Sequence, residues 1–267
     1  MPESFPEEFH DYPEDVLILC YHAVSRDWDH ELAVHPDQLE RHAAHLRRRG
    51  YRGATFTDVL TGSGPGRWVA FTFDDAQRSV WELARPILEA AGFPATVFVP
   101  TQFPDTDVPA RWDGLDAIAD SPHADELRPM TWAQLREAAD AGWELGSHTH
   151  THPHLRQLDD PALREELVRS REVLEDQLDR PCYSVAYPYG EVDYRVTEAA
   201  RDAGYVVGAT VRHPERPLPL RWPRTPVFRG DSDLIFRLRT SPALRRGMGT
   251  STGRMIINAA RRLGGRM

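Results

Sequence analysis

Four segments of the chain share one pattern, in which a helical stretch ends at a glycine that is followed by an aromatic residue and an apolar run. The junctions are Arg49-Gly50-Tyr51, Ala91-Gly92-Phe93, Ala141-Gly142-Trp143 and Ala203-Gly204-Tyr205. Glycine commonly ends helices because it adopts the left-handed backbone conformation without strain. Helices that alternate with apolar strands predict a parallel sheet with crossover helices, and 267 residues is a common length for a parallel α/β barrel.

The apolar runs and the helical stretches between them give the expected elements. We expect strands at Val16–Tyr21, Gly53–Phe56, Trp68–Phe73, Ala95–Pro100, Trp143–Ser147, Tyr183–Tyr187, Tyr205–Thr210 and Pro226–Phe228. We expect helices at Pro36–Arg49, Val80–Ala91, Trp132–Ala141, Pro161–Leu178 and Tyr194–Ala203. The Pro- and Asp-rich stretch Phe103–Arg128 is expected to be a loop or insertion over one face of the barrel.

Charge is distributed unevenly along the chain. The sequence contains no lysine, which excludes a Schiff-base mechanism. Residues 212–267 hold 13 arginines against 3 acidic residues, a net charge of +10, whereas the whole chain carries −9. Residues 251–267 mix apolar side chains with arginine, which fits peripheral contact with an anionic membrane, packing on the barrel or self-association. We predict no nucleic-acid partner.

Two further features concern the compartment. The N-terminal residues are acidic and contain no apolar signal-peptide core, and no apolar run reaches the ~20 residues that a membrane span needs. A cytoplasmic location is therefore the expectation. Cys20 and Cys182 lie in apolar runs, which predicts buried free thiols rather than a disulfide.

Polar side chains that are able to take part in catalysis or metal binding follow several of the predicted strands. Asp74 and Asp75 directly follow the third strand, His22 ends the first, His148 follows the fifth, and Pro188–Gly190 follows the sixth. In parallel α/β barrels the active site lies at the carboxyl ends of the strands. We therefore expect these residues to meet at one end of the barrel.

Three of these side chains have the composition of a metal site. His148 and His152 are four residues apart, and together with Asp75 they form a set of two histidines and one carboxylate. Such ligands suit Zn²⁺, with Co²⁺ or Ni²⁺ as alternatives, and leave positions open for water and substrate. Adjacent strand residues point in different directions, so Asp74 is free to act as a general base.

At this point the residues resemble a known family. Thr72-Phe73-Asp74-Asp75 and His148-Thr149-x-x-His152-Pro153 are similar to the first two motifs of the polysaccharide deacetylase family, the NodB type of carbohydrate esterase family 4. The resemblance covers about residues 15–230 and implies a distorted (β/α)7 barrel. It also implies specific roles: general base for Asp74, and metal ligands for Asp75, His148 and His152.

The third family motif departs from its usual form. The family has Arg-x-Pro-Tyr/Phe, but the chain reads Ala186-Tyr187-Pro188-Tyr189-Gly190, with Ala186 in place of arginine. The resemblance places the oxyanion against the backbone N–H of Tyr189, with Tyr187 and Pro188 in the same motif. The arginine normally orients the base, and Arg224 is a candidate to supply that charge from a later strand; a surface arginine is the alternative.

The family's last motif, a Leu-x-His near the C-terminus that supplies the general acid, is absent. The first strand instead ends in histidine, Leu17-Ile18-Leu19-Cys20-Tyr21-His22. This resembles the permuted motif order of poly-N-acetylglucosamine deacetylases and implies that His22 protonates the departing amine; a buried structural histidine is the alternative.

Other residues of possible use are less specific. His150 and His154 alternate with the two candidate ligands and are interpreted as lying at the rim of the site or behind the ligands as their supports. Four tryptophans are candidate sugar-stacking walls, although packing is the simpler interpretation: Trp28, Trp112, Trp132 and Trp222.

The sequence therefore predicts a metal-dependent N-deacetylase of N-acetylhexosamine-containing sugars or glycans. An O-deacetylase or another C–N amidase on the same scaffold is one alternative, and a weakly active carbohydrate-binding barrel is another. The domain prediction is an N-terminal extension at residues 1–14, a catalytic domain at 15–235 and a basic tail at 236–267.

Overall fold

The computed structural model describes residues 15–62, 64–211 and 217–247. They form a nine-stranded parallel sheet whose strands run in the order β10-β9-β8-β7-β6-β5-β1-β11, with β4 paired to β5. The strands are β1 (Asp15–Tyr21), β4 (Arg52–Gly53), β5 (Arg67–Phe73), β6 (Ala95–Val99), β7 (Glu144–Ser147), β8 (Ser184–Ala186), β9 (Val207–Thr210), β10 (Trp222–Pro223) and β11 (Thr225–Pro226). β2 (Ala23–Val24) and β3 (Ala33–Val34) pair separately.

The two ends of the sheet come together in one short segment. β10 pairs with β9 at one end of the order, and β11 pairs with β1 at the other. Only Arg224 separates β10 from β11 in the chain, so this segment nearly closes the sheet into a barrel. The fold is therefore a distorted (β/α)7 barrel, as the sequence predicts.

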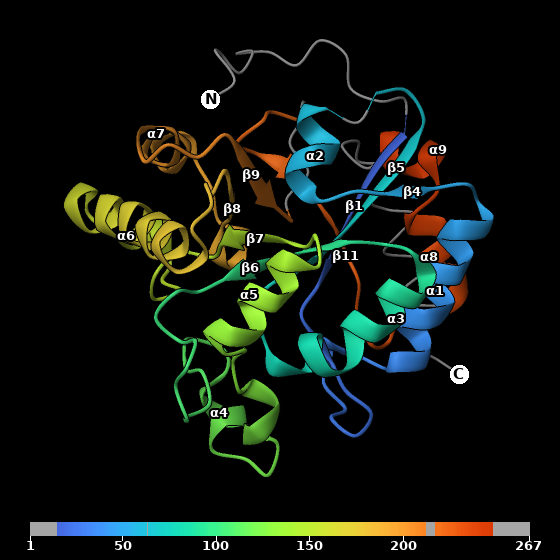
Figure 1. Ribbon diagram of the computed structural model, residues 1–267, viewed down its shortest axis with the longest axis horizontal. Coiled ribbons are helices and arrows are strands. Elements are labelled where there is room, and N and C mark those ends of the chain that lie inside the picture. Colours follow the sequence, from blue (N-terminus) through green and yellow to red (C-terminus); the bar gives the residue numbers. More distant parts are fainter. Residues whose placement is uncertain (1–14, 63, 212–216, 248–267) are drawn as a thin grey trace.

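Helices surround the sheet (Figure 1). The longer ones are α1 (Pro36–Arg48), α3 (Arg85–Ala91), α5 (Trp132–Asp140), α6 (Asp160–Leu178), α7 (Tyr194–Asp202) and α8 (Asp233–Arg239). The shorter ones are α2 (Phe56–Thr61), α4 (Asp116–Ala119) and α9 (Pro242–Gly247). The glycines of the four predicted junctions all have positive φ, between 74° and 91°, which confirms the reason for their occurrence: Gly50, Gly92, Gly142 and Gly204.

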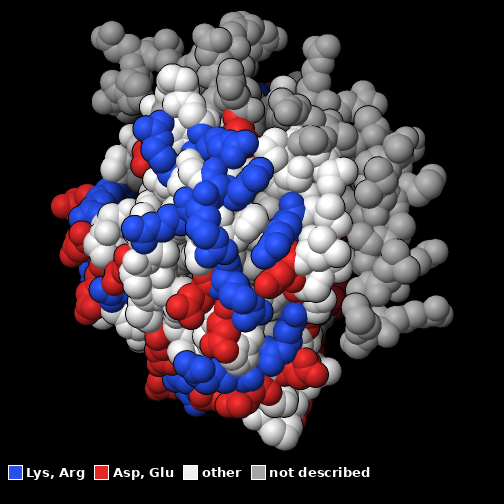
Figure 2. All heavy atoms as spheres, turned by 90° about the vertical axis from the view of Figure 1, so that its right-hand side faces the viewer, with Lys and Arg blue, Asp and Glu red and all other residues white. Residues whose placement is uncertain are grey.

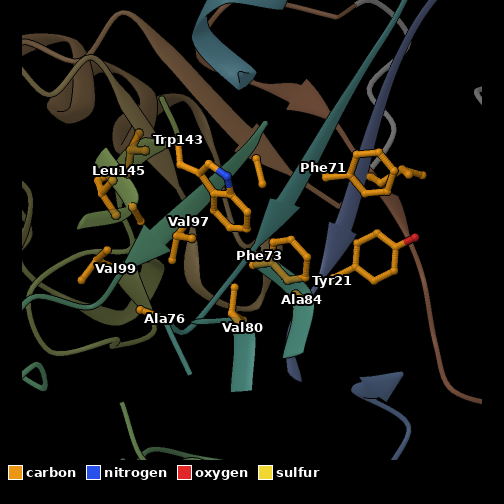
Figure 3. Packing of buried hydrophobic residues seen from close by; sticks show 14 of the residues in the cluster. Tyr21, Phe71, Phe73, Ala76, Val80, Ala84, Val97, Val99, Trp143 and Leu145 are labelled. Carbon is orange, nitrogen blue, oxygen red and sulfur yellow. The ribbon is translucent and has the colours of Figure 1, made fainter. Parts of the chain in front are cut away.

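The two faces of the strands carry separate apolar clusters. Along β1, Leu17, Leu19 and Tyr21 belong to the large cluster between the sheet and the helices, whereas Ile18 belongs to a smaller cluster with Phe98. This alternation follows from the two-residue period of a strand. Figure 3 shows part of the large cluster, with aromatic rings from neighbouring strands packed together.

Some predicted boundaries were wrong. The predicted strand Gly53–Phe56 ends at Gly53, because Thr55 caps the next helix and Phe56 begins α2. The predicted helix Val80–Ala91 begins with one π-helical turn, Val80–Ala84, before α3. The stretch Phe103–Arg128 is largely irregular, as predicted, and contains two short helical turns.

The predicted C-terminal tail begins within α8, and its residues 248–267 lie outside the described part of the chain. The proposed amphipathic segment 251–267 falls entirely in that part. Among the described residues, no helix combines the length and the apolar character that crossing a membrane requires.

Candidate active site and metal centre

The candidate site lies at the carboxyl ends of β1, β5, β7 and β8. Asp74 comes directly after β5, two residues after Thr72, and His22 comes directly after β1, two residues after Cys20. Because side chains two residues apart share a face of a strand, both pairs lie on the face opposite the large helix-side cluster. The polar residues that the sequence placed at separate strand ends are thereby brought together.

Asp74 is held by a buried arginine. The two guanidinium nitrogens of Arg224 donate to the two carboxylate oxygens of Asp74, each at 2.6 Å, and Nη1 also donates to Thr72 Oγ1 at 3.0 Å. Arg224 is 1% exposed and Asp74 is 4% exposed. Burial alone would raise the pKa of Asp74, but the guanidinium charge and its hydrogen bonds hold it well below its usual value. Asp74 is therefore an oriented, ionised carboxylate.

Asp75 points to a different set of partners. Its Oδ1 lies 3.5 Å from Nε2 of His148 and 3.6 Å from Nε2 of His152, and one possible ligand atom from each of the three residues lies within 4.8 Å of the others. All three side chains are buried. Burial and the adjacent charge of Asp74 raise the pKa of Asp75 well above its usual value, so a cation at this position would stabilise its ionised form.

The histidines have the protonation state that metal binding needs. His148 Nδ1 lies 2.8 Å from the carbonyl oxygen of Ala186. Because a carbonyl oxygen can only accept a hydrogen bond, Nδ1 carries the proton and the Nε2 lone pair is free. Burial lowers the pKa of both His148 and His152, which favours neutral imidazole. The donor set therefore fits a divalent cation.

The backbone is strained around these residues. Asp75, Thr149, His152 and Tyr189 all have positive φ, between 58° and 72°. Residues other than glycine rarely adopt this conformation, and such strain gathers at functional sites.

The loop that carries the two histidines is irregular rather than helical. Its backbone N–H groups at His150 and Thr151 both donate to Glu166 Oε2 at 2.9 Å, and the hydroxyl of Thr151 donates to Glu166 Oε1. The Nδ1 atom of His150 lies 2.9 Å from Thr101 Oγ1, and His150 is not in the described group of candidate ligands. A carboxylate from α6 therefore fixes the loop that presents His148 and His152.

His22 approaches the same Asp74 oxygen as His148, whose Nε2 lies 4.0 Å from Asp74 Oδ2. The Nε2 of His22 is also 4.0 Å from Asp74 Oδ2, and the His22 side chain is 21% exposed. Burial lowers the pKa of His22 to about 4, although the charge of Asp74 opposes this. Cys20 lies two residues before His22, and its Sγ lies 3.5 Å from the same Asp74 oxygen.

The third motif contributes mainly through its backbone. Tyr187 is buried and its hydroxyl donates to the carbonyl of Leu220 at 2.8 Å, and Pro188 is buried at the start of a 3-10 turn. The Tyr189 ring meets His152 edge-on at 4.9 Å between centroids. The Tyr189 ring therefore contacts one of the candidate metal ligands.

Two residues of the irregular segment, Trp112 and Asp113, join His154 and Tyr189 beside the candidate ligand His152. The Trp112 ring stacks on His152 at 4.2 Å, and Asp113 Oδ2 lies 3.1 Å from His154 Nε2. His154 stacks in turn on Tyr189 at 3.8 Å, and the Tyr189 hydroxyl donates to the carbonyl of Asp113. Asp113 and Glu191 raise the pKa of His154. We refer to Trp112, Asp113, His154 and Tyr189 as the site wall.

The sequence reasoning missed Cys20, and it named Trp112 only as one of four candidate tryptophans. Cys20 shares the face of His22, and the two-residue alternation of the strand could have shown this. Trp112 was one of four tryptophans with no distinguishing signal; the other three are buried, at 3–8% exposure.

Comparison with known proteins identifies relatives of this architecture. The family described as Polysaccharide deacetylase matches residues 61–208, more than half of the chain. The Bacillus subtilis protein YxkH, whose name assigns it to the polysaccharide deacetylases, is 26% identical over 203 residues, covering 74% of this chain and 65% of that protein. Poly-beta-1,6-N-acetyl-D-glucosamine N-deacetylase of Staphylococcus aureus is 25% identical over 188 residues, covering 66% of this chain and 60% of that protein. The chain thus spans less than two thirds of these relatives.

Solved structures share the fold. IcaB from Ammonifex degensii aligns with a TM-score of 0.67 and 23% identity, covering 86% of this chain and 97% of that chain. The Streptococcus pyogenes deacetylase PplD aligns with a TM-score of 0.65 and 23% identity, covering 81% of this chain and 94% of that chain.

Proposed function

The chain belongs to the polysaccharide deacetylase family, and from this membership we propose that it is a metal-dependent hydrolase that removes acetyl groups from N-acetylated sugars or glycans. One observation carries the proposal. The ligand set Asp75, His148 and His152 lies directly beside an oriented carboxylate, Asp74, which Arg224 holds through two bonds of 2.6 Å. A cation site next to a fixed base is the arrangement that metal-assisted hydrolysis of an amide uses.

Asp75, His148 and His152 would hold the cation, and we propose Zn²⁺, with Co²⁺ or Ni²⁺ as alternatives. When bound, the cation supplies polarisation of the acetyl carbonyl and a lower pKa for water. The His148 hydrogen bond to Ala186 and the Glu166 bonds to the histidine loop keep the ligands in place.

Asp74 is proposed as the general base. Its carboxylate cannot rotate, because both oxygens are held by Arg224. The low pKa that results weakens its basicity, so its contribution is positional: it accepts a proton from water at a defined point near the acetyl carbon.

His22 is proposed as the residue that returns a proton to the departing amine. With a pKa of about 4 it is neutral at the start of the reaction and must first gain a proton. Asp74 Oδ2 lies 4.0 Å from His22 Nε2, which offers a short route for the proton taken from water. The amine then leaves protonated, and acetate is the second product.

The remaining groups are proposed to bind the substrate. The backbone N–H of Tyr189, held in a strained conformation with φ of 58°, is assigned to the oxyanion. Trp112 presents an aromatic face to the sugar, since it lies at intermediate exposure against His152. An N-acetylhexosamine polymer is the proposed substrate class, in keeping with the named activity of the Staphylococcus aureus relative.

The proposal is tested with the purified full chain, by measuring acetate release from N-acetylglucosamine oligomers with and without added Zn²⁺. We expect release that depends on Zn²⁺ and falls by roughly a hundredfold or more in Asp74→Asn and His22→Gln. Arg164→Gln on the exposed side of α6 is the matched control and should keep full activity. Zn²⁺ binding without acetate release would favour a carbohydrate-binding barrel, and release from O-acetylated sugars alone would favour an O-deacetylase.

A further inference from the structure

A groove runs between α1 and α8 on the outside of the barrel, away from the carboxyl-end site. Two adjoining cavities form it, of about 150 Å³ and about 410 Å³, and both are lined by His45 and Arg237. The smaller cavity is lined by Arg41, His42, His45, Arg48, Asp233, Phe236 and Arg237. No step of the proposed hydrolysis uses any of these residues.

The groove is strongly cationic although the chain as a whole is acidic. Its two cavities are lined by four arginines, Arg41, Arg48, Arg49 and Arg237, against one carboxylate, Asp233, which is already paired with Arg41 at 3.2 Å. Arg48, Arg49 and Arg237 form no ion pair with any described residue. Figure 2 shows arginine side chains gathered on the face that carries α1 and α8.

The three unpaired arginines converge on one groove, since Arg48 and Arg237 line its smaller cavity and Arg49 and Arg237 line its larger one. After burial itself, the charges of Arg237, Arg48 and Arg49 are the main causes that lower the pKa of His45, which lines both cavities. Like charges repel when they are placed together without a counterion. Their convergence therefore leaves a position where an anion would be stabilised.

A buried ring nitrogen without a partner points to the same ligand. His42 lines the smaller cavity, is 1% exposed, and stacks on Phe236 at 3.6 Å. Its Nδ1 lies 3.0 Å from the hydroxyl of Tyr21, whereas its Nε2 has no hydrogen-bond partner in the described chain. When the Tyr21 hydroxyl donates to Nδ1, Nε2 carries the proton, and a buried N–H without an acceptor costs free energy.

We propose that the groove between α1 and α8 is a binding site for a phosphate group of a phosphorylated ligand. Guanidinium groups recognise phosphate through paired hydrogen bonds, and a phosphate has enough oxygens to accept from several arginines and from His42 at once. The larger cavity, lined partly by Leu46, Tyr51 and Leu238, accommodates the uncharged part attached to the phosphate. The site is independent of the proposed hydrolysis, because the groove lies outside the barrel.

The proposal is tested by titrating the full chain with inorganic phosphate and measuring the heat of binding by calorimetry. We expect saturable binding whose Kd rises about tenfold or more in Arg48→Gln/Arg237→Gln, because two charge-assisted contacts are removed. Both side chains are exposed, so the fold should tolerate the change. The matched control is Arg26→Gln/Arg164→Gln, which removes the same charge from exposed positions outside the groove.

A second arm separates the sources of the phosphate. Vesicles of phosphatidylglycerol, compared with phosphatidylcholine, test whether a lipid headgroup can occupy the groove. Inorganic phosphate binding that the groove variant loses and the control keeps supports the site, and parallel loss of vesicle binding assigns the phosphate to a lipid. No phosphate binding by the wild-type chain, or an equal loss in the control, would overturn the proposal, even if vesicles bind through diffuse charge.

Discussion

Replacing Arg224 by methionine is expected to destabilise the fold strongly. Arg224 donates to both oxygens of Asp74 at 2.6 Å and to Thr72 at 3.0 Å, and it is 1% exposed. Methionine fills part of the space but leaves Asp74 buried without a counter-charge. Breaking a buried ion pair in this way costs about 3–5 kcal/mol, so we expect the free energy of unfolding to fall by that amount at neutral pH.

The pH dependence of this loss has a defined sign. In the wild-type chain Arg224 lowers the folded-state pKa of Asp74, so its stabilising contribution is present above about pH 4 and is lost as the pH falls below it. In Arg224→Met, burial dominates and raises that pKa, so Asp74 takes up a proton on folding. The difference in stability between the two proteins should therefore shrink as the pH falls from neutral toward 4.

Urea unfolding followed by circular dichroism measures these quantities, with a chelator present so that metal binding does not add to stability. Arg224→Met/Asp74→Asn should be less destabilised than Arg224→Met alone, because the uncompensated charge is gone. Arg201→Met, which breaks the exposed pair with Glu198, is the control and should cost about 0–1 kcal/mol. A cost for Arg224→Met no larger than this control, with no recovery in the double variant, would refute the reasoning.

Three further outcomes are expected. His152→Ala should abolish tight Zn²⁺ binding in calorimetry while the far-ultraviolet spectrum stays unchanged, and retained stoichiometric binding would contradict the ligand assignment. Trp112→Ala should lower kcat/KM about tenfold through lost sugar contact, measured by acetate release; unchanged kinetics would assign Trp112 to packing alone. Burial lowers the pKa of folded-state His42 to about 3, whereas the unfolded chain takes up this proton near pH 6.5. The free energy of unfolding should therefore fall as the pH drops below about 6.5, and His42→Phe should flatten this pH dependence in urea titrations.

The barrel could be predicted from the sequence because its signals are local. Apolar runs, helix-ending glycines such as Gly92, and the polar residues at strand ends each report on a few neighbouring positions. The barrel closure was not predictable in the same way. β10 and β11 are two residues each, too short for any periodic pattern, and their pairing depends on strands far away in the chain.

The site shows the same division. Asp75, His148 and His152 were named from spacing and from resemblance, and the structure places their candidate ligand atoms within 4.8 Å of one another. The contact of Trp112 with His152 could not have been foreseen, because it joins an irregular segment to a loop 40 residues later in the chain.

Arg224 connects barrel closure to the orientation of the proposed base. Its backbone N–H donates to Thr210 at the end of β9, the flanking residues pair with β9 and β1, and its side chain reaches Asp74 after β5. The family places the corresponding arginine at position 186, but here that position is a fully buried alanine whose carbonyl accepts from His148. Closing the barrel with an arginine-bearing segment therefore supplies, from between β10 and β11, a charge that the third motif lacks. Because one residue serves both purposes, any change that opens the closing segment should also release Asp74.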